Sequence, residues 1–583
     1  MDAIDFFTQP QSPRQKQYEA LRAFYVEKQS ANTVAQRFGY TVSSFYSLTR
    51  TFRNHLKKGE LQQYYFVSET PGAKPKFEGT NTEQLIIELR KKSLSVPDIK
   101  SILDALGHSI SQRSVSRILE QEGFERLPRR TKQERQMNAN TPVLSAPIST
   151  MHRYTPDSFS SRNGVGLLCL LPFLEEYGIN QLIDASDYPE TECLSRRCSI
   201  LSFVALKLSN ISRYSVDNSW CMDRGLGFFA GVNVLPKAAW FSSYSHRVTR
   251  GMNHRFLKGL HQCWQHHNLL GNSANLDFVS IPYWGDDSHL ENNWSGSRNL
   301  SLPSILAVLA QDPDSGIITY GDTTIRHDNQ SNVVIEFLDF YRENDPNGTL
   351  KYLIFDSKFT TYKNLRKLED SPNKIKFITV RKRGVKILEE LKAIPESDWT
   401  TIRVMSADGK GRKVQVYEQI ISLKDYGKEI RQIAIKGSRR LQPALIITND
   451  FDRPIKEVIH QYARRWLVET EISEQVYFFH LNRVSSSMVI KVDFDLTMSI
   501  FAHNTYRLLA AELPGFSHQA AASLFDKFMD NGGKVIVDAQ RVNIILNKKR
   551  NMPVLLQAME RFQDKPLASL NNLKFQVSVD STS

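Results

Sequence analysis

Cysteine is scarce in this chain of 583 residues, and its five cysteines all lie between Cys169 and Cys263. Their odd number and the absence of any C-x-x-C spacing argue against a disulfide framework and predict a reducing, cytosolic interior. No apolar run approaches the roughly 18 residues that a membrane-spanning helix needs. The first residues, MDAIDFFTQP, lack the apolar stretch of a signal peptide. We therefore expect no membrane partner.

Acidic residues are outnumbered, because 75 Lys+Arg stand against 62 Asp+Glu, for a net charge of +13. This excess suits a polyanionic partner. With 41% hydrophobic residues the chain can bury a large core and is not disordered. A zinc finger is disfavoured, because the histidines and Cys263 of HQCWQHH, residues 261–267, have no standard spacing and no second ligand pair follows. A structural helix is the preferred interpretation.

Residues 1–62 are predicted to form a helix-turn-helix DNA-binding domain. Helices are expected over Pro13 to Lys28, over Ala31 to Phe38, and from Ser43 after a turn at Gly39. The second and third helices would pack through Val34, Ala35, Phe38, Val42, Phe45 and Leu48. The outward side chains of the third helix, which would read DNA, are Ser44, Ser47, Arg50 and Arg53. The alternative is an ordinary three-helix bundle.

The same plan recurs over residues 78–125, which are predicted to be a second helix-turn-helix domain. Ser95 is the expected N-cap of its middle helix, with Pro97 in the first turn and Asp98 three residues on. Ser111 caps the last helix. The exposed residues of that helix are Gln112, Arg113, Ser116 and Arg117. Two such units in tandem are typical of a bipartite DNA reader.

The rest of the chain divides into four predicted segments. Residues 126–164 are basic at first, then rich in Pro, Ser, Thr and Asn, and are expected to be a linker that follows DNA phosphates. Residues 165–270 are expected to be mostly helical, and 511–583 to be a C-terminal helical region. The intervening residues, 271–510, alternate strand-like and helical runs, which predicts an α/β core.

Two aspartates accompany strand-like runs in this core. Asp277 lies inside the apolar run LDFVS, and Asp356 follows the apolar strand Tyr352 to Phe355. A carboxylate at the end of a strand in an α/β sheet is where ligands and metals bind. Asp277 is costly to bury without a partner or a cation. The alternative for Asp277 is an exposed edge strand.

A third carboxylate, Glu469, belongs to the helical stretch YARRWLVE, residues 462–469. Asp277, Asp356 and Glu469 would supply the hard oxygen ligands that two divalent cations need. Such a pair of ions activates an attacking oxygen and stabilises the leaving 3′ oxygen of a phosphodiester. The same cluster would also serve a nuclease.

Three motifs resemble those of the DDE transposases of bacterial insertion sequences, in the branch with the Tyr-x2-Arg-x3-Glu signature. Tyr462, Arg465 and Glu469 match that signature, whereas DFVSIPYWGDD and YLIFDSKFTTYKNL resemble the segments of the two catalytic aspartates, Asp277 and Asp356. The resemblance covers about residues 165 to 510. It implies an RNase H-like core with a β-rich insertion, here at about 376–450.

The resemblance also implies roles for the site residues. Asp277, Asp356 and Glu469 would be catalytic and would bind two Mg²⁺ or Mn²⁺ ions. Tyr462 and Arg465 would contact the DNA end, and Arg suits that role because its planar fork grips phosphate oxygens.

One position departs from the family pattern, which adds a basic residue seven positions after the glutamate. Here that residue is Val476, and Arg483 or Lys491 would have to substitute. A second acid, Glu471, lies about 200° around the helix from Glu469, so both cannot face the metal ions.

The resulting hypothesis is a cut-and-paste transposase that binds the ends of its element and catalyses metal-dependent strand cleavage and strand transfer. Its partners would be double-stranded DNA, namely the terminal inverted repeats and the target, and it would act as a homodimer or larger synaptic assembly. A bacterial, cytoplasmic, nucleoid-associated location follows. The alternatives are a transposase-derived DNA-binding protein without catalysis and a metal-dependent nuclease without strand transfer.

Overall fold

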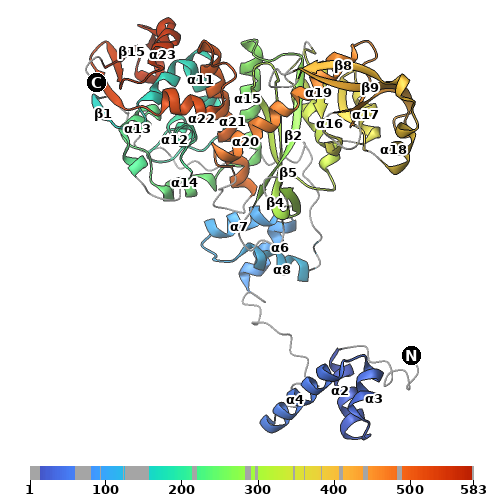
Figure 1. Ribbon diagram of the computed structural model, residues 1–583. Coiled ribbons are helices and arrows are strands. Elements are labelled where there is room, and N and C mark those ends of the chain that lie inside the picture. The colour runs from blue at the N-terminus through green and yellow to red at the C-terminus, as the bar shows by residue number, and fades with distance from the viewer. Residues whose placement is uncertain are drawn as a thin grey trace. The chain divides into compact units, whose positions relative to one another are not determined.

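The computed structural model describes residues 13–580 except 60–79, 92–93, 123, 125–156, 213–218, 283–289, 296–299, 344, 346–347, 360, 383, 406–410, 438–443 and 482–488. The described chain divides into two compact units, Met1–Glu83 and Gln84–Ser583 (Figure 1). Most of the predicted linker, 126–164, and the predicted substitute Arg483 therefore lie outside the described residues.

Residues 13–59 of the first unit form the helices α2 (Pro13–Tyr25), α3 (Ala31–Phe38) and α4 (Val42–Lys58). The side chain of Thr41 caps α4 by accepting a hydrogen bond from the backbone N–H of Ser44. The buried core of this unit consists of Ala20, Ala23, Val34, Ala35, Phe38 and Phe45. Val42 was expected in this core, but its side chain is 39% exposed because it lies in the first turn of α4, outside the contact with α3.

A second group of three helices comprises α6 (Asn81–Lys91), α7 (Val96–Ala105) and α8 (Gln112–Gln121). Ser95 and Asp98 form a capping box at the start of α7, and Ser111 caps α8, as the sequence predicted. Helix α7 contacts α21 (Val489–Glu512), and the Ser101 hydroxyl of α7 lies 3.1 Å from Nδ1 of His246. The sequence predicted a second helix-turn-helix domain over residues 78–125 and gave no indication of these contacts.

A helical segment leads into the large sheet. Its helices are α10 (Leu171–Glu176), α11 (Ile179–Ala185), α12 (Arg196–Leu208), α13 (Arg224–Phe229), α14 (Ala238–Ser245) and α15 (Arg250–His266). The HQCWQHH stretch lies at the end of α15, and His261 is buried there against the ring of Tyr341.

Ten strands form the large sheet of this unit. They are β2 (Ser273–Pro282), β3 (Asn292–Ser295), β4 (Leu300–Gln311), β5 (Ile318–Ile325), β6 (Tyr352–Phe355), β7 (Lys376–Val380), β8 (Thr400–Met405), β9 (Gly411–Ser422), β10 (Glu429–Lys436) and β11 (Ala444–Thr448). The order is β3-β4-β2-β6-β7-β11-β10-β9-β8, and β5 pairs with β4. Strand β2 pairs with β4 on one side and β6 on the other. The edge-strand alternative for Asp277 is therefore wrong.

The predicted insertion is continuous with this sheet. Strand β7, with which the predicted insertion at about 376–450 begins, pairs in parallel with β6. Strands β8 to β11 extend the sheet beyond β7 through antiparallel pairs. The helices beside this sheet are α16 (Val333–Arg342), α17 (Tyr362–Glu369) and α18 (Val385–Lys392).

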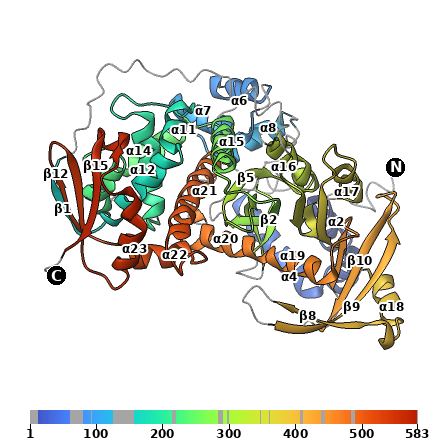
Figure 2. The ribbon, with the colours of Figure 1, turned by 90° about the horizontal axis from the view of Figure 1, so that it is seen from above.

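Three helices follow the last strand of the sheet, namely α19 (Ile455–Arg464), α20 (Trp466–Tyr477) and α21 (Val489–Glu512). Helix α20 contacts β2 and β4, and α21 lies between α12 and β5 (Figure 2). Because α21 is surrounded in this way, its described residues are buried almost all round. This arrangement places α20, which carries Glu469, directly on the strand that carries Asp277.

The C-terminal region differs from the helical region predicted over 511–583. Besides the short helices α22 (Ala521–Leu524) and α23 (Met552–Met559), it contains β12 (Gly533–Val537), β13 (Arg541–Leu546), β14 (Pro566–Leu567) and β15 (Leu573–Val579). These strands form a sheet with β1 (Phe159–Ser161), which was predicted to be part of the linker. Alternating burial along β13 is the period-two pattern of a strand, which the sequence analysis missed.

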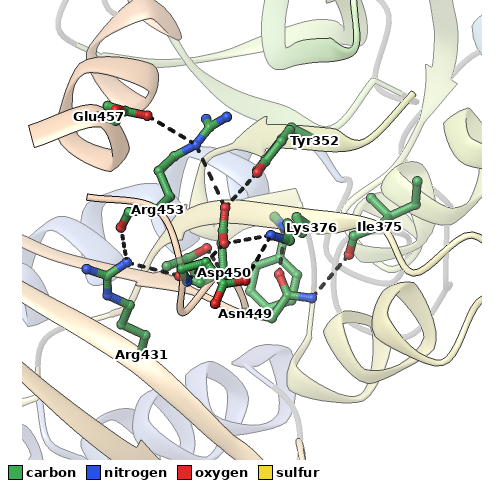
Figure 3. A network of polar contacts seen from close by, with 11 residues as sticks. Tyr352, Ile375, Lys376, Arg431, Asn449, Asp450, Arg453 and Glu457 are labelled. Carbon is green, nitrogen blue, oxygen red and sulfur yellow. Dashed lines mark hydrogen bonds and ion pairs between the residues drawn. The ribbon is translucent and has the colours of Figure 1, made fainter. Parts of the chain in front are cut away.

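A buried aspartate, Asp450, connects the core strands to the added strands (Figure 3). One carboxylate oxygen accepts a hydrogen bond from the Tyr352 hydroxyl at 2.6 Å, and the other accepts from Nζ of Lys376 at 2.7 Å. Arg431 on β10 donates to the main-chain carbonyl of Asp450 at 3.0 Å. Burial opposes ionisation of Asp450, but these donors outweigh it and lower its pKa. Strands β6, β7, β10 and β11 are thereby joined just before α19.

Replacing Asp450 by asparagine should lower the free energy of unfolding at neutral pH by about 2–3 kcal/mol, because Lys376 and Tyr352 would lose a charged partner. Since the folded pKa of Asp450 is depressed, the advantage of the wild type should be present above the ordinary pKa and vanish as the pH falls through the folded value. Urea denaturation measures both effects.

The matched control is Asp452→Asn, because the Asp452 side chain is 94% exposed. This change should alter the free energy of unfolding by no more than about 0.5 kcal/mol. Equal losses in the two variants would show that the Asp450 contacts contribute nothing specific.

Candidate active site

The strand register brings the two predicted aspartates together. Strands β2 and β6 run in parallel, and Leu276 on β2 is the register partner of Phe355 on β6. Asp277 and Asp356 each follow one member of this pair, so they occupy the same level on neighbouring strands. Leu276 and Phe355 are both fully buried on the opposite face. The alternation of side chains along a strand therefore directs both aspartates to one face of the sheet.

Glu469 reaches the same region from helix α20. Helix α19 ends at Arg464 and α20 begins at Trp466, and Arg465 at the junction keeps right-handed helical dihedral angles. The backbone N–H of Arg465 bonds to the carbonyl of Tyr462 at 3.1 Å, so the junction is a tighter turn within the helical stretch that the sequence predicted. Asn275, two residues before Asp277, donates a hydrogen bond from Nδ2 to the main-chain carbonyl of Arg464 at 3.0 Å. This bond fixes the junction to strand β2.

Arg465 binds two of the three predicted acids. One guanidinium nitrogen lies 2.6 Å from Oδ2 of Asp277, and another lies 2.6 Å from Oε1 of Glu469. The side chain of Arg465 is only 8% exposed, that of Asp277 is 16% exposed, and that of Glu469 is 50% exposed. The site therefore contains a buried positively charged side chain, Arg465, and an acid that is half exposed to solvent, Glu469.

The ionisation of the site follows from this burial. Burial raises the pKa of Asp277 to about 6; Arg465 opposes the shift, and Glu469 and Asp356 add to it. Burial likewise raises the pKa of Tyr462 to about 12, with Asp356 and Asp277 contributing. The pKa of Arg465 is raised, because its attraction to Asp277, Tyr462 and Glu469 exceeds the opposing effect of burial. The five groups form one electrostatic unit.

The donor chemistry of this site fits a hard divalent cation. Three carboxylates are the ligands that Mg²⁺ and Mn²⁺ prefer. Among the described residues, however, the oxygens of Asp277, Asp356 and Glu469 do not all approach within 4.8 Å of one another. Arg465 holds Asp277 and Glu469 in the present arrangement. Arg465 pairs with one oxygen of Asp277 and one oxygen of Glu469.

One expectation about a neighbouring residue changes with the structure. Lys491, a predicted substitute for the basic residue missing at Val476, is 7% exposed and lies 3.3 Å from the Ser242 hydroxyl. Burial lowers its pKa to about 8. Lys491 is thus buried on α21 and is not available to a DNA end. Val476 packs against the main hydrophobic core.

Glu471 turns away from the predicted site, as its helical position required. It accepts a hydrogen bond from Nε2 of Gln311 at 3.2 Å and lies 3.2 Å from Nε2 of His503. The sequence analysis missed the contribution of Asn275 and the partner of Arg464, whose guanidinium lies 2.7 Å from Asp314. Both contacts join residues that are far apart in sequence, and no local pattern indicates them.

The predicted DNA-reading residues of the first unit lie on one helix. Ser44, Ser47, Arg50 and Arg53 are all exposed on α4. Arg53 donates a hydrogen bond to the Tyr25 hydroxyl at 2.9 Å, whereas Arg50 has no polar partner within the described part of the chain. On α8, Arg113 and Arg117 are exposed, but Gln112 is half-buried.

A family model of transposases matches part of this chain. Residues 284–505 match the family model described as "Transposase DDE domain". The match includes Asp356 and Glu469 and begins seven residues after Asp277. No curated protein matches the sequence.

A solved structure described as a piggyBac transposase synaptic complex with hairpin DNA is similar over 62% of this chain and 80% of that chain. Its sequence identity is 11% and its TM-score is 0.33. In the described residues of the present chain, no helix is long and apolar enough to cross a membrane.

Proposed function

We propose that this protein is a DDE transposase that binds the ends of a mobile element and catalyses DNA cleavage and strand transfer. The observation that carries the proposal is the placement of Asp277 and Asp356 at one level of neighbouring parallel strands, with Arg465 bridging Asp277 to Glu469. The match of residues 284–505 to a transposase DDE domain supports it. We assign the bacterial insertion-sequence branch from the Tyr462, Arg465 and Glu469 spacing.

The strand order supports an RNase H-like assignment for the core. Three antiparallel strands, β5-β4-β2, are followed by two further strands, β6 and β7, that run parallel to β2. The acids lie on β2, directly after β6, and on a helix that crosses the sheet. In this proposal the segment from α18 to β11 is the β-rich insertion.

Asp277, Asp356 and Glu469 would hold two Mg²⁺ or Mn²⁺ ions. When bound, such ions activate an attacking oxygen and stabilise the leaving 3′ oxygen of a phosphodiester. Arg465 keeps the acids neutralised until DNA arrives, and then exchanges Glu469 and Asp277 for phosphate oxygens, which its fork binds in the same way. Tyr462 packs beside Arg465, with the guanidinium 5.6 Å from its ring centre, and limits where the guanidinium can turn.

The proposed partners are the terminal inverted repeats of the element and the target DNA. Helix α4 would read the repeats through Ser44, Ser47, Arg50 and Arg53, and α8 would add Gln112, Arg113 and Arg117. Joining two element ends requires at least two protomers, so we propose a homodimer or larger synaptic complex. The site of action would be the nucleoid in a bacterial cytoplasm.

Amide variants of the three acids test the chemistry. Asp277→Asn, Asp356→Asn and Glu469→Gln should each abolish cleavage of DNA that carries the repeats flanking the gene, while binding to that DNA persists. Each change removes a negative ligand and nearly preserves shape. Because the acids act as a unit, double variants should be scarcely worse than single ones.

Glu457→Gln is the control for these variants, because Glu457 lies on α19 and its side chain is 64% exposed. It should cleave at the wild-type rate. Normal cleavage by Glu469→Gln would refute the proposed triad. If the wild type cleaves DNA but does not join the ends to a target, the protein is a metal-dependent nuclease without strand transfer. Absence of cleavage with binding retained in the wild type would favour a DNA-binding protein derived from a transposase.

Charge-removing variants of α4 test recognition of the ends. Arg50→Ala and Arg53→Ala should each weaken binding to the repeats. Each should also reduce the slope of the logarithm of the binding constant against the logarithm of salt concentration by roughly the amount that one phosphate contact contributes. Arg22→Ala is the control, because this substitution removes the same charge from a different helix. Arg22 lies on α2 and is paired with Glu19 and Glu27. Fluorescence anisotropy with repeat and scrambled duplexes measures both quantities. Equal losses in all three variants would refute the assignment of α4.

A further inference from the structure

A second cluster of ionisable side chains lies on the other side of α20 from Glu469. Oε2 of Glu471 is 3.2 Å from Nε2 of His503, and Oε2 of Glu474 is 3.4 Å from Nδ1 of the same ring. The His503 side chain is fully buried, and the two glutamate side chains are each 12% exposed. The ligand atoms of the three residues lie within 4.8 Å of one another.

The hydrogen bonding of His503 leaves one ring nitrogen available. Nε2 donates to the main-chain carbonyl of Gly316, in the turn between β4 and β5, at 3.0 Å. A backbone carbonyl accepts only from a protonated nitrogen, so this contact places the hydrogen of a neutral ring on Nε2 and the lone pair on Nδ1. Metal-binding histidines are oriented in this way by their second nitrogen. Nδ1 is the atom that faces Glu474.

Several buried polar atoms around this cluster lack a hydrogen-bond partner within the described part of the chain. They are Oε2 of Glu471, Nδ1 of His503, Oε1 of Gln311, and both polar side-chain atoms of Gln475. Gln311 is directed toward the cluster, since its other polar atom donates to Glu471. The side chain of Gln475, fully buried, lies one turn beyond Glu471 on the same helix. Most of these atoms are acceptors, and a cation would satisfy several at once.

The charge balance also favours a cation. Two carboxylates with little exposure face one fully buried imidazole here. A positive charge is therefore stabilised between the two carboxylates. A proton on Nδ1 supplies one charge, and a divalent ion would supply two.

We propose that Glu471, Glu474 and His503 bind one divalent transition-metal ion, with Zn²⁺ as the ion that the donor set fits best. One imidazole nitrogen and two carboxylate oxygens are ordinary zinc ligands, and Gln311 or a water molecule completes four-coordination. Mg²⁺ prefers oxygen ligands alone and retains several waters, which a buried site disfavours. This site is structural: it joins α20 to α21 and, through Gly316, to the turn between β4 and β5.

The proposal does not depend on the transposase assignment, because none of its ligands belongs to the proposed catalytic site. Its structural consequence concerns α20. Glu469 and Glu471 are on the same helix, so an ion that anchors Glu471 and Glu474 to α21 also limits movement of the helix that carries Glu469. Glu474 is anchored further by accepting a hydrogen bond from the backbone N–H of Ala521 at 3.2 Å.

The test is metal binding by the full chain with the proposed catalytic acids removed. In an Asp277→Asn, Asp356→Asn background, chelator-treated protein should take up about one Zn²⁺ per chain and gain thermal stability on doing so. Adding His503→Gln or Glu474→Gln should weaken that uptake by at least about tenfold. Adding Glu457→Gln, an exposed glutamate on α19, should change nothing.

X-ray absorption by the zinc-loaded protein covers the case in which the ligand variants fail to fold. The expected first shell contains oxygen and nitrogen with a single imidazole and no sulfur. A sulfur shell would assign the ion to the cysteines and overturn the proposal. Failure of the protein to take up Zn²⁺, or uptake unchanged in His503→Gln, would also overturn it and would mean that a proton on His503 balances the acids.

Discussion

The buried guanidinium of Arg465 is the interaction on which the proposed active site depends. It lies at the junction of α19 and α20 and bonds to an acid on the sheet and an acid on the helix. Removing one partner of such a buried pair typically costs about 3–5 kcal/mol, because the other charge is left without compensation. Asp277 and Glu469 therefore stay close in the absence of any cation. In the proposed mechanism, Arg465 exchanges these acids for phosphate oxygens of the DNA.

The surrounding structure supplies the rigidity that this arrangement needs. The hydrogen bond from Asn275 on β2 to the main-chain carbonyl of Arg464 fixes the helix junction to the sheet. Upstream, Asp450 fastens β11 to β6 and β7 immediately before α19 begins. The added strands β8 to β11 are thus part of one sheet with the core. Their position affects where α19 begins, and through α19 it affects where Arg465 lies.

The sequence predicted the acids and the strands that carry them because these features have local signals. An apolar run that ends in Asp356 and a Tyr-x2-Arg-x3-Glu spacing are visible in short windows. The caps at Ser95 and Ser111 were predicted for the same reason, since capping depends on residues three positions apart. Boundaries that depend on strand pairing were not predictable in this way. The parallel pairing of β7 with β6, for example, joins residues that no short window of sequence relates.

Other features escaped prediction because they join distant residues. The pairing of β1 with β12 spans most of the chain, and no pattern near Phe159 indicates it. The tighter turn at Arg465 was not predicted, because helical spacing does not distinguish it from a regular helical turn. The dual ion pair of Arg465 was also unforeseen: the family resemblance assigned this residue to DNA, whereas the structure shows it bound to Asp277 and Glu469.

The most direct measurement is a crystal structure of the chain with Mn²⁺ and a duplex that carries the element end, with anomalous diffraction used to locate the ions. The account predicts manganese between Asp277, Asp356 and Glu469, and an Arg465 guanidinium that has left both acids for a phosphate of the DNA. A complex that cleaves its DNA while Arg465 still bridges Asp277 and Glu469, with no manganese at those acids, would contradict it.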